Sequence, residues 1–266
     1  MVRTVVRVFI IGNGFDIHYG IKADYEDFAL FLKEKDEPLR ELFDELLQGT
    51  SGWGKLEKSL GEIDVNNKKF LDNPIFKQAY GELIEEYFTE WALTINEKLV
   101  INKDLTFKEE DKFFTFNYTD TLELGYGVDS SRVLHIHGSA NLLRVERLFV
   151  KDKEKYKEKL LFGHCNKANL DDKFLESTLK NVERNLKNKE TIIKEKFSNI
   201  DEIIVLNHSV NDIDMPYYLF FNNLNPGAFW KFYCHFDSDI SNVKKNTKWL
   251  EDKRKIILSD KEFYSN

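Results

Sequence analysis

The fold is decided by the stretch Val5-Val6-Arg7-Val8-Phe9-Ile10-Ile11-Gly12-Asn13-Gly14-Phe15-Asp16. Residues 5–11 are mostly β-branched or aromatic, and the run is too short for a capped helix, so it predicts a buried strand. Gly12 and Gly14 then allow the backbone to approach another group closely. In doubly wound α/β folds that group is often a pyrophosphate, held by the turn amides and the N-terminus of the next helix. The dinucleotide fingerprint is incomplete because Ile17 stands at its third glycine position, so a plain strand-to-helix turn is the alternative.

Length, charge and cysteine content restrict the class of protein. The 266 residues are enough for one large α/β domain with its own core. The two cysteines, Cys165 and Cys234, lie too far apart for a paired zinc or disulfide motif, which favours a reducing compartment. A net charge of −7 gives no general attraction to nucleic acid, and no stretch reaches the ~18 apolar residues that cross a bilayer. We therefore expect a cytoplasmic protein whose main partner is neither a membrane nor nucleic acid.

The segment from 24 to 108 is predicted to be a helical insertion. A helical apolar face starts after Asp24, a plausible N-cap, and Pro38 ends or restarts that helix. Further helices are expected over residues 39–47, 53–60 and 75–100. A charge run at 151–159 and a charged helical segment at about 165–200 are expected to form solvated faces or an exposed hairpin. No repeat or linker divides the chain, so we expect a single domain spanning residues 1–266.

Short apolar runs after the insertion predict further strands, and most of them stop at polar residues. These runs are residues 112–116, 132–137, 160–162, 202–206, 229–234 and 254–258. Open parallel sheets bind ligands at the carboxyl ends of their strands, so such endings are expected to converge on one crevice. The pattern predicts an α/β Rossmann-type fold, with a mostly parallel sheet and helices on both faces.

Two of these strand ends carry candidate catalytic groups. His137 is suited to act as a general base near neutral pH, with a structural histidine as the alternative. His135 and His137 face the same side of a strand, which suits a metal site or simple packing, but no carboxylate stands at a recognised ligand spacing, so we expect no metal. Asn117 and Asp120 suit a turn and helix cap, and the amide of Asn117 would also position a water molecule.

Other polar residues have both a local and a ligand-binding interpretation. Ser209, Asn211 and Asp212 either cap the following helix or bind ribose hydroxyls and phosphate. Asp16 would repel phosphate, so it is expected to cap the helix, to fix the glycine loop or to contact a ribose hydroxyl. The chain contains neither the G-x-S-x-G elbow of serine hydrolases nor the P-loop pattern.

Read in order, these segments resemble the AbiH-like family of bacteriophage abortive-infection proteins. The resemblance is carried by Phe9 to Asp16, Phe116-Asn117-Tyr118-Thr119-Asp120-Thr121-Leu122, His135-Ile136-His137-Gly138-Ser139, Phe162-Gly163-His164, and His208-Ser209 through Asp212 and Asp214, with Trp53 and Glu57 before a long helix. Asn207 stands where this family usually has glycine, and asparagine tolerates the left-handed backbone such a position requires.

The order of these motifs is also similar to that of sirtuin-like NAD-binding domains. The resemblance implies a catalytic group of His137, Asn117 and Asp120, with the last two near the nicotinamide ribose, Gly12 and Gly14 under the phosphates and Ser209 on the adenosine side. The implied binding residues are Gly12, Asn13, Gly14, Phe15, Asp16, Gly138, Ser139, Gly163, His164, His208, Ser209 and Asp212. The four zinc cysteines of sirtuin deacetylases are missing, which argues against protein deacetylation.

These observations lead to one expected function and two alternatives. The resemblance implies an antiphage effector that hydrolyses NAD to nicotinamide and ADP-ribose, with NAD as substrate and no metal. A phage-derived trigger and assembly into a homo-oligomer are compatible with that role. The first alternative is a sensor module that binds NAD or ADP-ribose without hydrolysing it. The second is a metal-dependent nuclease effector, which would show a steep dependence on salt.

Overall fold

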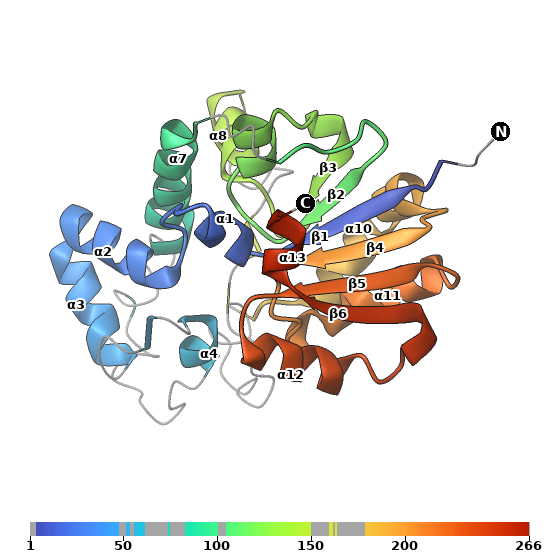
Figure 1. Cartoon of the computed structure of the whole chain (residues 1–266). Coiled ribbons are helices and arrows are strands. Elements are labelled where there is room, and N and C mark those ends of the chain that lie inside the picture. The colour runs from blue at the N-terminus through green and yellow to red at the C-terminus, as the bar shows by residue number, and fades with distance from the viewer. Residues whose placement is uncertain are drawn as a thin grey trace. The chain divides into compact units, whose positions relative to one another are not determined.

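The chain forms two compact units. The computed structural model describes residues 4–47, 52–53, 56–61, 74, 83–100, 105–149, 160–161, 163 and 179–265. The first unit contains Met1–Ile21, Leu99–His137 and Val182–Asn266, and the second contains Lys22–Lys98 and Gly138–Asn181. The first unit carries the β-sheet, and the second is built from helices (Figure 1).

The first unit is built on a parallel sheet of six strands in the order β3-β2-β1-β4-β5-β6. The strands are β1 (Arg7–Ile11), β2 (Lys112–Thr115), β3 (Val133–His135), β4 (Glu202–Leu206), β5 (Phe229–Cys234) and β6 (Lys255–Ser259). Phe9 of β1 pairs with Phe113 on one side and with Ile204 on the other. The chain therefore adds strands in both directions from β1, which is the strand order of doubly wound nucleotide-binding folds. The predicted α/β Rossmann-type fold is confirmed.

The central strand is buried on both faces, as its continuous apolar sequence predicts. Val8, Phe9, Ile10 and Ile11 are each at most 1% exposed. Val8 and Ile10 belong to one hydrophobic cluster, and Phe9 and Ile11 belong to another. Because successive side chains of a strand point to opposite faces, these clusters are the two halves of the core.

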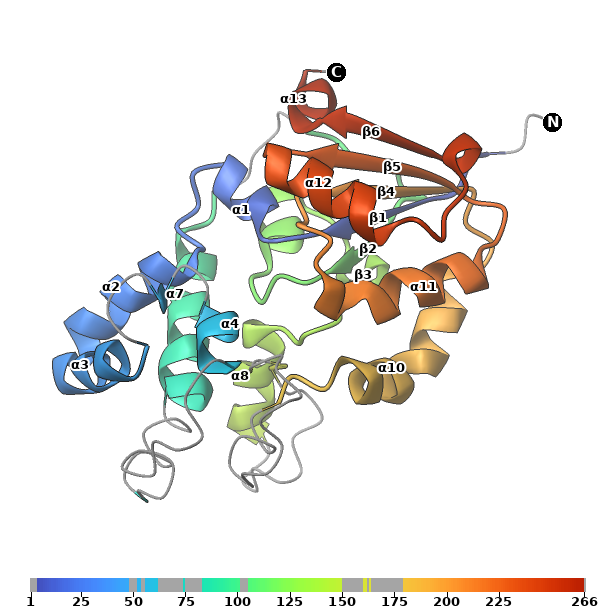
Figure 2. The same cartoon turned by 90° about the horizontal axis from the view of Figure 1, so that it is seen from below.

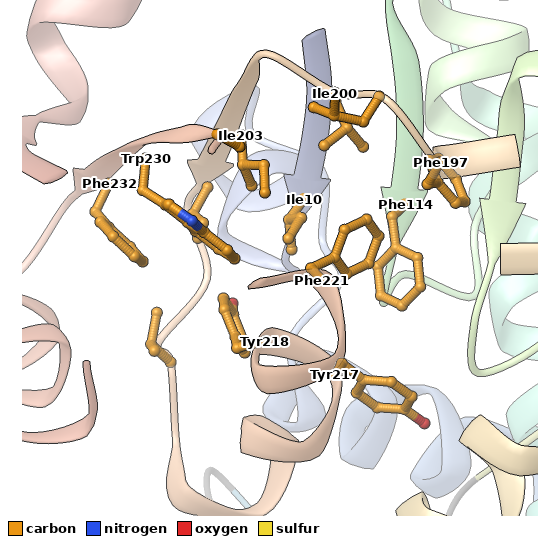
Figure 3. Packing of buried hydrophobic residues seen from close by; sticks show 14 of the residues in the cluster. Ile10, Phe114, Phe197, Ile200, Ile203, Tyr217, Tyr218, Phe221, Trp230 and Phe232 are labelled. Atoms are coloured by element: carbon orange, nitrogen blue, oxygen red, sulfur yellow. The ribbon is translucent and has the colours of Figure 1, made fainter. Parts of the chain in front are cut away.

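Three helices cover one face of the sheet. They are α10 (Val182–Phe197), α11 (Met215–Leu224) and α12 (Asp237–Asn246), which lie along the same side of the strands in Figure 2. Figure 3 shows Tyr218 and Phe221 of α11 pointing toward the strands, where Phe221 meets Phe114 edge-on at 4.9 Å between ring centroids. Trp230 of β5 is fully buried in the same cluster. Aromatic rings therefore supply much of the apolar area that holds these helices to the sheet.

The opposite face is covered mainly by short elements. These are α1 (Gly14–His18), the π-helix η3 (Thr121–Gly125) and α13 (Asp260–Tyr264), together with the segment before β2. Phe9 stacks on Phe113 and meets Phe107 edge-on, with centroids 5.4 and 5.2 Å apart. The first turn after β1 is thus anchored to the core through Phe15, which is fully buried.

The described part of the second unit is mainly helical, in agreement with the helices predicted after Asp24. It contains α2 (Tyr25–Lys35), α3 (Glu37–Leu46), α4 (Leu56–Gly61), the π-helix η2 (Leu83–Phe88), α7 (Thr89–Lys98) and α8 (Ala140–Phe149). Asp24 caps α2 by accepting a hydrogen bond from Asp27 N at 2.8 Å. Pro38 lies in the first turn of α3, where a missing N–H costs nothing. Both helix starts are therefore confirmed.

Two expectations from the sequence need correction. Leu160 and Leu161 lie outside regular structure, so the strand expected at 160–162 does not form at these two residues. Phe162 lies outside the described residues. The charged helix α10 is only partly a solvated face, because Lys189 and Lys196 donate to carbonyl oxygens of residues 133–136. The charge run at 151–159 lies outside the described residues. Within the described ranges, no helix combines the length and the apolar character that a membrane crossing requires.

Candidate functional site

The loops that follow β1, β2, β3 and β4 meet at the carboxyl edge of the sheet. The loop after β1 touches the loop after β4, where Gly12 lies against Asn207 and His208. The helix after β1 is hydrogen-bonded to the turn after β2 through Asp16 and Thr119. This is the edge at which doubly wound folds bind their ligands.

Gly12 and Gly14 are required by the packing of the chain itself. A Cβ on Gly12 would lie 2.6 Å from the carbonyl oxygen of Asn207 and 2.7 Å from Cα of His208, and a Cβ on Gly14 would lie 3.0 Å from Asn207. The first two distances are shorter than any real Cβ contact, and they involve backbone atoms that cannot swing away. The close approach that the glycines predicted is thus an approach between two loops of the protein.

The loop after β4 is held in a strained conformation. Asn207 and Val210 have φ values of 51° and 48°, in the left-handed region that a β-branched residue rarely enters. Asn207 donates to Asp260 at 3.0 Å and accepts from the hydroxyl of Tyr264 at 2.5 Å. Asparagine therefore supports the left-handed turn, as its place in the sequence predicted.

His208 stabilises the same loop through its ring. Its Nδ1 accepts hydrogen bonds from the backbone N–H of Val210 at 3.0 Å and from the hydroxyl of Tyr218 at 2.9 Å. These bonds assign the ring proton to Nε2, which lies 3.5 Å from Asp214. The ring also packs on Phe116, with centroids 4.2 Å apart. The contacts of His208 therefore stabilise the loop after β4.

The turn after β2 brings Asn117, Thr119 and Asp120 to the same edge. Asp120 occupies the N-cap position of η3, but its side chain makes no capping hydrogen bond. One of its carboxylate oxygens lies 3.7 Å from Nε2 of His135. The backbone of Asn117 is fixed at both ends, since its N–H donates to Oγ1 of Thr115 at 3.1 Å and its carbonyl oxygen lies 2.9 Å from Nδ1 of His135. Asp120 therefore stands at the N-cap position, as the sequence predicts, but its side chain does not cap the helix.

Asp16 is a fully buried carboxylate within this edge. Its Oδ2 accepts a hydrogen bond from the hydroxyl of Thr119 at 2.5 Å. Its Oδ1 is buried and has no hydrogen-bond partner within the described chain. Burial raises the pKa of Asp16 to about 6, although Thr119, Thr121 and Asn117 act in the opposite direction as hydrogen-bond donors. Asp16 lies inside α1 and makes no cap, so the capping interpretation is wrong.

His135 forms a buried ionic group with Glu123 and Asp120. Nε2 of His135 lies 3.0 Å from a carboxylate oxygen of Glu123, while its Nδ1 faces the carbonyl of Asn117. Both neighbours are obligate acceptors, so the ring satisfies them only as an imidazolium. Burial acts to lower the pKa of His135, but the hydrogen bond and charge of Glu123, the carbonyl of Asn117 and the charge of Asp120 raise it overall.

The same three side chains have a composition that suits a metal ion. One ligand atom from each of Asp120, Glu123 and His135 lies within 4.8 Å of the other two. The hydrogen bond from Nδ1 of His135 to a backbone carbonyl is the outer contact that metal-bound histidines usually make. A proton on Nε2 and a divalent cation are therefore alternative ways to neutralise this group.

We expect the ionic group to stabilise the fold in a pH-dependent way. Because folding raises the pKa of His135 above its ordinary value of 6.5, the stabilisation is complete below pH 6.5 and is lost as the pH rises through the folded pKa. Glu123→Gln should therefore lower the free energy of unfolding most at pH 6 and least at pH 9. Urea unfolding of both proteins across this range checks the prediction, and a pH-independent difference would contradict it.

His137 lies at the end of β3, surrounded by aromatic rings. Its ring meets Phe116 edge-on at 5.0 Å and lies 6.3 Å from Tyr118, so it flanks the strand end that carries Asn117. The backbone before it is fixed by α10, since Asn185 donates to the carbonyl of Ile136 at 2.8 Å. The three predicted catalytic residues, His137, Asn117 and Asp120, thus come from the ends of two adjacent strands.

Several other predicted binding residues have local contacts of their own. Gly138 and Ser139 belong to the second unit, where Oγ of Ser139 accepts from Leu142 N at the start of α8. Asp212 is exposed and pairs with Lys245 at 3.0 Å. Asn13 is exposed and Phe15 lies in the core. Ser209 accepts a hydrogen bond from the side chain of Asn211. Gly163 itself lies outside regular secondary structure, and His164 lies outside the described residues. Asn211 stands at the N-cap position of the 3-10 helix η7 (Asp212–Asp214), within the range where the sequence predicts a cap, but its side chain makes no capping hydrogen bond.

Sequence reasoning missed a histidine–carboxylate pair at the carboxyl ends of β5 and β6. Nδ1 of His235, directly after β5, lies 2.7 Å from Asp260, directly after β6. Asp260 is 1% exposed and also holds Asn207. The sequence did contain a signal for this pair, because each of the two residues directly follows a predicted strand, as the other candidate polar residues do. Glu123 was missed because nothing in its spacing indicates His135 as a partner.

Comparison with known proteins gives one match over most of the chain. Residues 8–233 match the model of a protein family that is described as bacteriophage abortive infection AbiH. The match includes β1 to β5 almost completely and therefore all the strand ends that form the network. A search of curated proteins found no match.

Proposed function

The chain belongs to the AbiH family of bacteriophage abortive-infection proteins, and on this premise we propose that it hydrolyses NAD to nicotinamide and ADP-ribose. The observation that carries the proposal is the position of His137, Asn117 and Asp120 after β2 and β3, at the same carboxyl edge of the sheet as the point between β1 and β4 where the strand order reverses. Doubly wound sheets bind nucleotides at that point. Hydrolysis of a glycosidic bond is helped by a general base that activates water and by a carboxylate that stabilises the oxocarbenium-like state, and an amide is suited to position the water.

The proposed reaction needs no redox partner. The bond between the nicotinamide nitrogen and the ribose carbon breaks, and nicotinamide leaves as a neutral molecule with the bonding electrons. The ribosyl group passes through a state with oxocarbenium character, which nearby carboxylates stabilise electrostatically. Asn117 holds a water molecule that attacks the same carbon, and His137 accepts the proton that this water loses. The products are nicotinamide, ADP-ribose and one proton.

The proposal is tested by following NAD and nicotinamide directly. Purified protein is incubated with NAD, and proton NMR records free nicotinamide and the line width of the NAD signals over time. The same two metabolites are measured in bacteria that carry the gene, before and after phage infection, so that a phage-derived trigger is included. Nicotinamide release in either setting supports a hydrolase. Line broadening without release in both settings points to a sensor. The absence of both nicotinamide release and line broadening would overturn a role for NAD.

One observation favours a second candidate, a metal-dependent nuclease. The group Asp120, Glu123 and His135 offers two carboxylates and an imidazole, a ligand set that divalent metals accept. Cleavage of phage DNA or RNA that needs added Mn²⁺ or Mg²⁺, and that stops with EDTA, would support this function. Nicotinamide release that is insensitive to EDTA would exclude it as the activity of this edge.

A further inference from the structure

We propose that Asp120, Glu123 and His135 hold one divalent transition-metal ion, and that this ion switches off the hydrolysis proposed above when it binds. The switch rests on the proposed function, whereas metal binding stands independently of it. The sequence predicts no metal, because its histidines and carboxylates lack a recognised ligand spacing. The tertiary structure brings three such side chains together from two segments of the chain, the turn with η3 after β2 and the end of β3.

The distances between the three side chains match those between the ligands of one metal ion. Nε2 of His135 lies 3.0 Å from Oε1 of Glu123 and 3.7 Å from Oδ1 of Asp120. Two ligand atoms that are each about 2.0 Å from a tetrahedral ion stand about 3.3 Å apart, which falls between these two values. An ion therefore fits among the three side chains with small movements, and its fourth position would take a water molecule or a further ligand.

The backbone presents the two acidic side chains on one side of η3. Asp120 and Glu123 are three residues apart, a spacing that places side chains on the same face of a helical turn. The carbonyl of Asp120 accepts from Leu124 N at 2.8 Å, and the carbonyl of Glu123 accepts from Gly127 N at 3.1 Å. Short π-helical turns of this kind occur frequently at functional sites. Both carboxylates thus project from a turn whose own hydrogen bonds hold it in place.

His135 is oriented to bind an ion through Nε2. Its Nδ1 lies 2.9 Å from the carbonyl oxygen of Asn117, and its own carbonyl oxygen accepts from Nζ of Lys189 at 3.1 Å. A histidine that is hydrogen-bonded in this way carries its proton on Nδ1 when it is neutral. The lone pair of Nε2 then faces two carboxylates, an arrangement that requires a cation between them, either a proton or a metal ion.

Charge and unused ligand capacity favour the metal ion over the proton. Among these three side chains, one proton on Nε2 compensates only one of the two carboxylates, and an uncompensated charge is costly in a buried position. A divalent ion bound to the neutral imidazole compensates both. In addition, Oε2 of Glu123 is buried and has no hydrogen-bond partner in the part of the chain that the structure describes. This carboxylate therefore has a ligand atom to spare.

The ligand set selects the class of ion. An imidazole nitrogen suits Zn²⁺ and other transition metals, and carboxylate oxygens suit Mn²⁺ as well. Mg²⁺ and Ca²⁺ are hard cations that prefer ligand shells made of oxygen. We therefore expect Zn²⁺ and Mn²⁺ to bind more tightly than Mg²⁺ or Ca²⁺, and Zn²⁺ is the probe used in the test.

A bound ion opposes the proposed hydrolysis electrostatically. Asp120 is the carboxylate proposed to stabilise the positive charge that develops on the ribosyl group as the glycosidic bond breaks. A divalent ion on Asp120 cancels this negative charge and places positive charge beside the reacting group, which raises the barrier. Metal binding and hydrolysis thus compete for one side chain.

Titration of the metal-free protein with Zn²⁺ tests the site, and isothermal calorimetry should give one ion per chain. Glu123→Gln keeps the shape of the side chain but replaces a carboxylate oxygen by an amide group, so it should weaken binding at least about tenfold. His235→Gln is the matched control, because His235 and Asp260 offer a histidine and a carboxylate without a third ligand among the described residues. This variant should bind Zn²⁺ as the wild type does.

Two further measurements do not depend on how well Glu123→Gln folds. X-ray absorption of the zinc-loaded wild type should show one imidazole, with oxygen ligands at about 2.0–2.2 Å. Nicotinamide release, followed in the purified protein or in lysates of infected cells, should fall at least about tenfold when one equivalent of Zn²⁺ is added to the metal-free protein, and EDTA should restore it. At the same concentration of Zn²⁺, Glu123→Gln should keep its own rate.

The outcomes separate the site, the switch and the hydrolysis. Equal affinity of the wild type and Glu123→Gln for Zn²⁺, or bound zinc without an imidazole ligand, would overturn the site. Binding at this site with unchanged release of nicotinamide would overturn the switch alone. A metal-free protein that releases no nicotinamide, even in infected cells, would overturn the hydrolysis and the switch with it, and the calorimetric titration would still decide the metal site.

Discussion

Replacing His137 by alanine is expected to lower the rate of nicotinamide release between about 10²- and 10⁴-fold, the usual contribution of a general base. The imidazole lies at the end of β3 and is 3% exposed, so bulk water cannot easily take over its proton. At the level of the barrier, the loss corresponds to roughly 3 to 5 kcal/mol. The measurement is an NMR time course with NAD at saturating concentration. Cells that carry the variant should keep their NAD after infection.

Because the ring of His137 is packed against its neighbours, further variants are needed to separate loss of the base from loss of packing. Alanine leaves a space beside Phe116, so His137→Gln, which fills that space but takes up no proton at neutral pH, should lose the same activity. Tyr217→Phe changes another neighbour of the imidazole, at 5.9 Å between ring centroids, without removing its ring. This control should keep the rate within a few-fold. Full activity in His137→Gln would exclude His137 as the base.

Replacing Gly12 by alanine is expected to reduce the free energy of unfolding by about 3 kcal/mol. The added methyl group would stand 2.6 Å from the carbonyl oxygen of Asn207 and 2.8 Å from Cβ of His208. Overpacking in a tight contact typically costs about 1–3 kcal/mol, and the upper end applies here because the loop after β4 is already strained. The melting temperature should fall by roughly 5–10 °C.

Gly227→Ala is the matched control for that prediction. A Cβ at Gly227 has no heavy atom within 4 Å, and its backbone lies outside the region that only glycine enters easily. Its unfolding free energy should stay within about 0.5 kcal/mol of wild type. Thermal melts and urea titrations of both variants make the comparison. If Gly12→Ala melts with the wild type, the loops after β1 and β4 do not pack as described.

The strands were predictable because each is a short run of mainly apolar residues that can be recognised from the local sequence alone. The run at β4 is apolar after Glu202, and the run at β5 alternates buried residues with partly exposed ones; their predicted ranges of 202–206 and 229–234 agree with the structure. The helix starts at Asp24 and Pro38 were predictable for the same reason, since caps and proline act on the adjacent backbone. Leu160 and Leu161 carry a similar apolar signal but lie outside regular structure, so a short apolar run does not by itself ensure a strand.

The contacts of the site were less predictable than its location. Polar residues after strands correctly indicated the carboxyl edge of the sheet. They did not indicate that Asp16 pairs with Thr119, a residue 103 positions away, or that His208 accepts a hydrogen bond from a residue only two positions on. Side chains at strand ends choose partners by distance in space, and residue type alone leaves several partners equally suitable.

The sequence by itself determined the class of fold, the helical pattern of the segment after β1 and the edge of the sheet at which the polar residues gather, because hydrophobic periodicity and the helix-capping and turn residues act on the adjacent backbone. Only the tertiary structure decided what the polar residues do. It assigned Gly12 to a loop contact, His208 to a backbone hydrogen bond and His135 to a buried ionic group with Glu123. Burial and the packing of β1 between β2 and β4 create those environments, and a buried charge takes its properties from its surroundings rather than from its own residue type.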